Sequence, residues 1–155
     1  MNYPPPMKSL KILLVFGLIP LVLGGCDALQ VDSRKFDDDP KLEFAPTTQT
    51  VDEGAGTVTT SIQLIGEQRD SDLNVSYTVA DSSTADEGTH YSLGSTSATI
   101  SAGTSSTDVE VDVLDNSADD EDTDYVLYLN LQDSDGVEAA ENLKTFTLVI
   151  RGTDE

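Results

Sequence analysis

The sequence predicts an all-β domain, an antiparallel β-sandwich of about seven strands. Three observations predict it. Apolar and polar residues alternate with a period of two in several segments, glycine-containing turns separate these segments, and only residues 137–142 could form a helical turn or a loop. Because each such strand is apolar on one face, that face must be buried against a second sheet, which favours two packed sheets.

The alternating segments begin after Lys41. Each places aliphatic or aromatic residues at every second position, as a half-buried strand does. The longer ones are residues 58–64, 73–79, 109–113, 125–131 and 146–150, and shorter strands are expected at residues 42–44, 50–51 and 98–100. Residues 133–136 (Asp-Ser-Asp-Gly) invite comparison with an EF-hand loop, but the spacing of oxygen ligands does not fit, and a hairpin turn is expected there.

The N-terminal residues have the pattern of a signal peptide. Lys8 and Lys11 precede an uncharged stretch of 14 residues, 12–25. A helix that crosses the hydrocarbon core needs about 20 apolar residues, so a permanent membrane span is disfavoured. We therefore interpret residues 1–25 as a signal peptide.

The end of this stretch, Leu23-Gly24-Gly25-Cys26, resembles the lipobox of bacterial lipoproteins. The resemblance implies that Cys26 is lipidated after cleavage, so that the protein is extracytoplasmic and attached to a membrane of the bacterial cell envelope through its lipid. The alternative is an ordinary secretory signal followed by an unmodified thiol. Residues 26–41, with the run Asp-Asp-Asp-Pro at 37–40, form an acidic tether, and residues 42–155 form the folded domain.

The charge excludes one class of partner. All 29 acidic residues follow Cys26, whereas two of the eight basic residues precede it, so the mature chain has six basic residues and a formal charge of −23. Proteins bind DNA or RNA by neutralising phosphates with Lys and Arg, so we expect no nucleic-acid partner. Because the acidic residues are spread along the chain, we attribute them mainly to solubility in a salty medium.

Three short motifs lie between the predicted strands: Val-Asp-Glu-Gly-Ala-Gly at 51–56, Thr-Ala-Asp-Glu-Gly-Thr-His-Tyr at 84–91 and Val-Leu-Asp-Asn at 113–116. An acidic loop and a strand led by Tyr125 follow the third. In order and spacing they resemble the V-x-E-G-x-G, T-A-x-x-G-x-D-Y and I-L-D-D motifs of the Calx-beta domain, the β-sandwich of sodium/calcium exchangers and many bacterial surface proteins. The resemblance implies an immunoglobulin-like sandwich over about residues 42–152.

The resemblance also implies that acidic loops converge at one end of the sandwich. Calcium takes six to eight oxygen ligands, which these loops could supply. The candidate ligands are Glu53, Asp86, Asp115, Asp119, Asp120 and Glu121, with Glu87, Asp122 and Asp124 beside them. Two positions depart from calcium-binding members, since His90 and Asn116 stand where those carry acids. A calcium site and a solvated acidic rim therefore both remain open, and calcium is the only cofactor that the sequence suggests.

Catalytic machinery is not expected. His90 is the sole histidine and Cys26 the sole cysteine, which leaves no set of residues for Ser/His/Asp or Cys/His catalysis. We interpret His90 as a partly exposed residue beside Tyr91 at the start of a strand. The leading hypothesis is a lipid-anchored interaction or structural module that binds another envelope or surface protein, and the alternative is a calcium-dependent binding domain.

The charge generates a testable prediction. Because a formal charge of −23 repels itself in the compact state, sodium or potassium chloride should stabilise the domain alike, through screening over a Debye length of about 10 Å at 0.1 M. The measurement is the melting temperature from low to molar salt at neutral pH. A flat profile would show that general self-repulsion does not limit stability.

Overall fold

The computed structural model describes residues 38–116 and 123–152, and these form ten strands and no helix. The strands are β1 (Lys41–Ala45), β2 (Thr48–Asp52), β3 (Gly56–Ile65), β4 (Leu73–Val79), β5 (Tyr91–Ser92), β6 (Ser97–Ile100), β7 (Ser106–Val113), β8 (Asp124–Leu131), β9 (Glu138–Ala139) and β10 (Thr145–Arg151). Within these ranges, no helix is long and apolar enough to cross a membrane.

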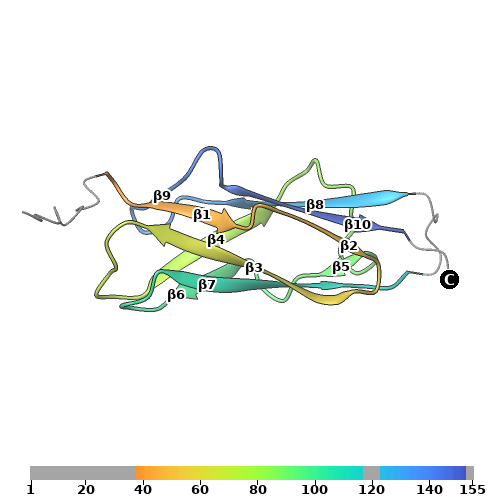
Figure 1. The fold of residues 1–155 in the computed structure, drawn as a ribbon, viewed down its shortest axis with the longest axis horizontal. Coiled ribbons are helices and arrows are strands. Elements are labelled where there is room, and N and C mark those ends of the chain that lie inside the picture. The colour runs from red at the N-terminus through yellow and green to blue at the C-terminus, as the bar shows by residue number, and fades with distance from the viewer. Residues whose placement is uncertain (1–37, 117–122, 153–155) are drawn as a thin grey trace, which may run out of the picture. The chain divides into compact units, whose positions relative to one another are not determined.

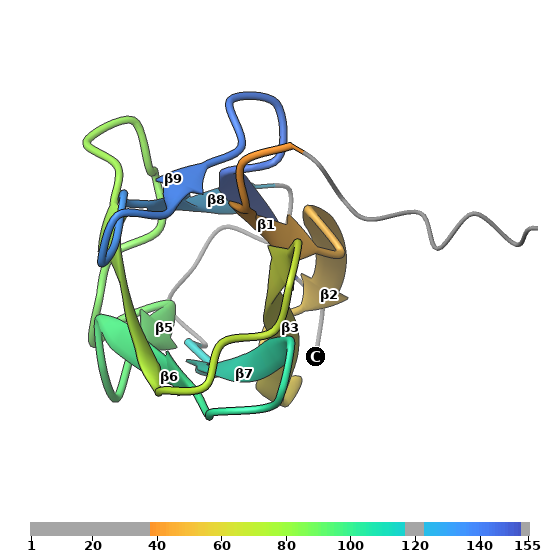
Figure 2. The same cartoon turned by 90° about the vertical axis from the view of Figure 1, so that its left-hand side faces the viewer.

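The strands form two five-stranded sheets that face each other across the core (Figures 1 and 2). One sheet has the order β5-β7-β3-β1-β9 and the other the order β2-β10-β8-β4-β6. Neighbouring strands are antiparallel except in two pairs, β1 with β9 and β2 with β10. The predicted all-β sandwich is confirmed.

The first strand of the domain is divided between the two sheets. β1 pairs with β3 along its whole length, and after Pro46 and Thr47 the chain continues as β2 beside β10 in the opposite sheet. This division explains one of the parallel pairs. The eight segments predicted from the alternation correspond to β1–β4, β6–β8 and β10, and the two-residue strands β5 and β9 bring the number to ten.

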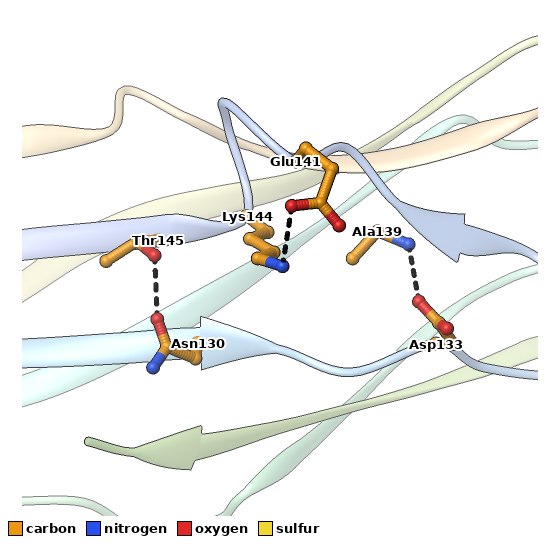
Figure 3. A network of polar contacts seen from close by, with 6 residues as sticks. All are labelled: Asn130, Asp133, Ala139, Glu141, Lys144 and Thr145. Carbon is orange, nitrogen blue, oxygen red and sulfur yellow. Dashed lines mark hydrogen bonds and ion pairs between the residues drawn. The ribbon is translucent and has the colours of Figure 1, made fainter. Parts of the chain in front are cut away.

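The segment predicted as a helical turn or loop, residues 137–142, contributes β9. Glu138 and Ala139 pair in parallel with the start of β1, and Ala139 is buried. The Ala139 N–H donates to Oδ1 of Asp133 over 2.9 Å (Figure 3). Pairing with β1 satisfies backbone groups that a helical turn of this length would leave without partners, because a helix loses four at each end.

The polar contacts around this segment join β8 to β10. The Thr145 Oγ1 hydroxyl donates to Oδ1 of Asn130 over 2.7 Å, and Lys144 forms an ion pair of 3.2 Å with Glu141 (Figure 3). The side chain of Asp133 fixes the chain where it leaves β8. Hydrogen bonds and an ion pair of its own side chains thus hold the connection between β8 and β10 in place.

The turn at residues 133–136 has the geometry of a hairpin. Ser134 and Val137 exchange backbone hydrogen bonds of 2.9 Å in both directions. The two central residues have positive φ, 48° at Asp135 and 80° at Gly136, as a type I′ turn requires. The predicted hairpin turn, rather than an EF-hand loop, is confirmed.

The core consists of the inward-facing residues of both sheets, as the period of two predicts. Phe44 of β1 and Phe146 of β10 face each other across the sandwich with ring centroids 5.7 Å apart and 44° between their planes. Both are almost fully buried, as are Leu127 and Leu129 of β8. This packing fixes both sheets, and so determines where the connecting loops lie.

Candidate functional site

Three connections meet at the end of the sandwich where β2, β7 and β10 finish. The Glu53 N–H donates to the Arg151 carbonyl over 2.9 Å, and the Gly54 N–H donates to the Leu114 carbonyl over 3.0 Å. The Leu114 N–H in turn donates to the His90 carbonyl over 3.0 Å. The β2–β3 turn, the β4–β5 loop and the segment after β7 are therefore joined by backbone hydrogen bonds. We call this region the loop end.

Glycine at position 54 permits a close approach between two segments of the loop end. Gly54 has a φ of +68°, which disfavours other residues, and a Cβ placed on it would lie 3.2 Å from the Cβ of Asp115. A side chain at this position would have to displace Asp115. The glycine of the first motif thus allows the β2–β3 turn to lie directly against Asp115.

The sequence-predicted ligands divide into two groups. Glu53 is half-buried at the loop end, while Asp86 and Asp115 are exposed there. Asp119, Asp120 and Glu121 lie outside the described residues, as does Cys26.

The described donors alone do not fit a calcium ion. Within residues 38–116 and 123–152, no three side chains of His, Cys, Asp or Glu are grouped so that they could hold a metal ion. Calcium requires six to eight oxygens. The acidic residues between Asn116 and Thr123 lie outside the described residues, and the calcium hypothesis stays a prediction.

His90 differs most from its sequence interpretation. It was expected to be partly exposed, but only 5% of its surface is accessible. Its Nδ1 accepts a hydrogen bond of 2.7 Å from the Asp86 N–H, and its ring stacks on Tyr125 with centroids 3.8 Å apart and 28° between the planes. The interpretation was wrong because the ring of Tyr125, at the start of β8, covers the imidazole.

The hydrogen bond at Nδ1 determines what His90 can offer an ion. In a neutral imidazole one nitrogen carries the hydrogen and the other accepts, so acceptance at Nδ1 places the hydrogen on Nε2. One nitrogen is thus engaged by the backbone and the other is an N–H donor. His90 in this arrangement has no lone pair left for a cation, and it organises the β4–β5 loop instead.

Tyr91 and Tyr125 were not among the predicted site residues. Tyr91 is buried beneath the loop end, and burial raises the pKa of its phenol, with the charges of Glu87 and Asp86 raising it further. It therefore remains an uncharged core residue at neutral pH. The available signal was the position of Tyr91 at the end of the second motif and of Tyr125 in the strand after the third, but nothing in the sequence indicates that Tyr125 stacks on His90.

The fold and the loop end together define a class, an immunoglobulin-like β-sandwich in which motif-bearing loops are joined at one end. The sequence model of the Calx-beta domain family matches residues 35–151, and the chain belongs to this family. The family predicted from the three motifs is confirmed.

Several solved structures have a similar fold. The apo-form Calx CBD1 domain has a TM-score of 0.64 and 23% identity, and the match covers 76% of this chain and all of that one (100%). The calcium-binding domain CBD12 of CALX1.1 has a TM-score of 0.62 and 23% identity over 72% of this chain and 44% of that one. A putative carbohydrate-binding protein from Bacteroides ovatus has a TM-score of 0.57 and 17% identity over 74% and 38% of the two chains. At these identities the similarity shows the fold alone. No curated protein sequence matches the chain.

Two substitutions of His90 distinguish how much its hydrogen bond and its ring stack each contribute to stability. His90→Phe keeps an aromatic ring against Tyr125 but removes the acceptor for the Asp86 N–H, which should cost about 1–3 kcal/mol of unfolding free energy. His90→Asn keeps an acceptor near the position of Nδ1 but removes the stack, which should cost about 0.5–1.5 kcal/mol. Denaturant unfolding measures both. Wild-type stability of His90→Phe would contradict the role given to the hydrogen bond.

Proposed function

We propose that this protein is a lipid-anchored, extracytoplasmic interaction or structural module of the bacterial cell envelope, without catalytic activity. Its Calx-beta domain is carried on a short acidic tether and binds another envelope or surface protein rather than nucleic acid. Cys26 attaches it to the membrane.

The observation that carries the proposal is the set of contacts that His90 makes. Calcium-binding members of the family carry an acid at this position, whereas His90 accepts from the backbone of Asp86 and stacks on Tyr125. Together with the backbone bonds at Glu53, Gly54 and Leu114, these contacts organise the loop end through the protein itself. A domain organised in this way does not require a bound ion to present its surface.

Attachment through Cys26 is supported by the lipobox-like Leu23-Gly24-Gly25-Cys26 after an uncharged stretch. Burial of acyl chains contributes about 0.8 kcal/mol per methylene, and stable anchoring needs more than one chain. Bacterial lipoproteins carry two or three. The acidic residues from Asp27 to Asp39 favour a tether that extends from the surface, because like charges along a linker repel one another.

Cys26→Ser should abolish the anchor. We expect the variant to remain unprocessed or to leave the membrane fraction, and to lose incorporation of radiolabelled palmitate. Ser33→Ala, in the same tether, is the control and should behave as the wild type. Unchanged processing and detergent-phase partitioning of Cys26→Ser would contradict lipidation at this residue.

A second candidate function is calcium-dependent binding. It is favoured by the contact of the β2–β3 turn with Asp115, which brings Glu53 and Asp115 to the same end of the sandwich, and by the acidic sequence that follows Asn116. Carboxylates gathered there repel one another when no ion is bound. A divalent ion would relieve this repulsion, whereas a monovalent salt would only screen it.

Melting curves at fixed ionic strength distinguish the two candidates. The proposed function predicts coincident wild-type curves in calcium, in magnesium and in neither. A calcium site would add about 2.7 kcal/mol at a hundredfold excess over its dissociation constant. A calcium-specific shift that Glu53→Gln with Asp115→Asn abolishes would establish the second candidate in place of the first. Glu67→Gln with Asp70→Asn, exposed beyond the far end of β3, is the matched control.

A further inference from the structure

We propose that the cleft between β6 and β7 is a strand-docking site, in which an extended, basic segment of a partner protein pairs with the exposed edge of β7. The inference deepens the interaction module proposed above, and rests on it, by giving the class of the partner segment. Figure 2 shows β6 and β7 next to each other where the two sheets meet, on the side away from β9.

β7 has a full partner on only one side. All eight of its residues pair with β3, from Ser106 opposite Gln63 to Val113 opposite Gly56. On the other side β5 pairs only with Asp112 and Val113. The sheet therefore ends at β7 over residues 106–111.

The register shows which backbone groups this edge presents. The Leu64 N–H donates to the Ser105 carbonyl, and hydrogen bonds between antiparallel strands engage every second residue. It follows that Ser106, Asp108 and Glu110 direct their N–H and C=O groups away from β3. No backbone hydrogen bond between described residues reaches these groups from the β6 side.

The facing edge of β6 is closed locally. The Tyr77 N–H donates to the Thr96 carbonyl, so the next residue, Ser97, directs its backbone away from β4. The Ser95 Oγ donates to the Ser97 carbonyl over 2.8 Å and accepts from the Ser97 N–H over 3.1 Å. Ser95 thus occupies both backbone groups of Ser97. On β6 only Thr99 is left with backbone groups directed away from β4, whereas β7 presents three such residues, Ser106, Asp108 and Glu110.

The corresponding corner at β2 and β3 is bridged by side chains. The Gln49 Nε2 donates to the Thr59 carbonyl over 2.8 Å, and the Thr60 Oγ1 donates to the Pro46 carbonyl over 2.9 Å. Between β6 and β7 there is instead a cleft of about 320 Å³, with Tyr77 and Val109 among its lining residues. Open strand edges pair readily with other chains, and proteins generally protect them.

Charge identifies the occupant. The exposed side chains along this edge are acidic at alternate positions, Asp108, Glu110 and Asp112. Asp108 and Asp112 each accept a 2.6 Å hydrogen bond, from Ser61 and Thr57, and these contacts hold their carboxylates against β3. Residues directly opposite in a paired strand interact most favourably when their charges are opposite. A partner strand with Lys or Arg at alternate positions fits, whereas a second copy of this chain, with a formal charge of −21, would be repelled.

The test uses the full chain in zwitterionic detergent micelles and a defined probe, the peptide Lys-Val-Lys-Val-Lys-Val-Lys. In a ¹⁵N NMR titration, we expect the Asp108 and Glu110 amides to shift and to become protected from hydrogen exchange. A peptide with the same sequence and N-methylated backbone cannot donate to β7 and should bind at least about tenfold more weakly, as should a peptide with Glu in place of Lys. The Glu110→Lys variant of the domain should also bind the unmodified peptide more weakly.

The other outcomes overturn the proposal. Equal binding of the methylated peptide would mean that charge alone attracts it, and protection at Thr48 and Thr50 instead of β7 would place the contact on another edge. Absence of binding would exclude strand docking, and sedimentation as a dimer without peptide would identify a second copy as the occupant. None of these results affects processing at Cys26, so failure of the docking site and failure of the anchor are distinguishable.

Discussion

The division of the first strand between the two sheets is the constraint on which the rest of the domain depends. Only Pro46 and Thr47 separate β1 from β2, yet the two strands belong to opposite sheets. The hydrogen bond from Thr60 to the Pro46 carbonyl fixes the crossing point. Because β2 then runs beside β10, its end places Glu53 against Arg151, and the loop end is assembled from that contact.

The sequence predicts those parts of the fold that depend only on residues within one strand or one turn. The alternation in residues 58–64 and 125–131 identifies β3 and β8, and Asp135-Gly136 determines its turn through local backbone preference. β5 and β9 have no such signal. Two residues cannot show a period, and each of these strands exists because a longer strand, β7 or β1, offers it hydrogen bonds.

The candidate site was less predictable than the fold. In a chain with 29 acidic residues, carboxylates in loops carry little information by themselves, so the motifs had to identify the loop end. They placed Glu53 and Asp115 at the same end, where backbone bonds join their segments. They did not reveal that His90 is buried, since its ring partner, Tyr125, lies in a distant strand and becomes a neighbour only through folding.

The loop end and the edge of β7 have a common structural origin in the β4–β5 loop. The His90 carbonyl accepts from Leu114, which brings the following two residues into register with Val113 and Asp112 as β5. The chain then leaves the sheet toward Gly94 and Ser95, because it must enter β6 in the opposite sheet. His90 thus also sets where β5 begins, and the early exit of the chain leaves the edge of β7 that faces away from β3 without a partner strand from Ser106 to Val111. In this domain, the β4–β5 loop therefore determines both the organisation of the loop end around His90 and the exposure of the β7 edge.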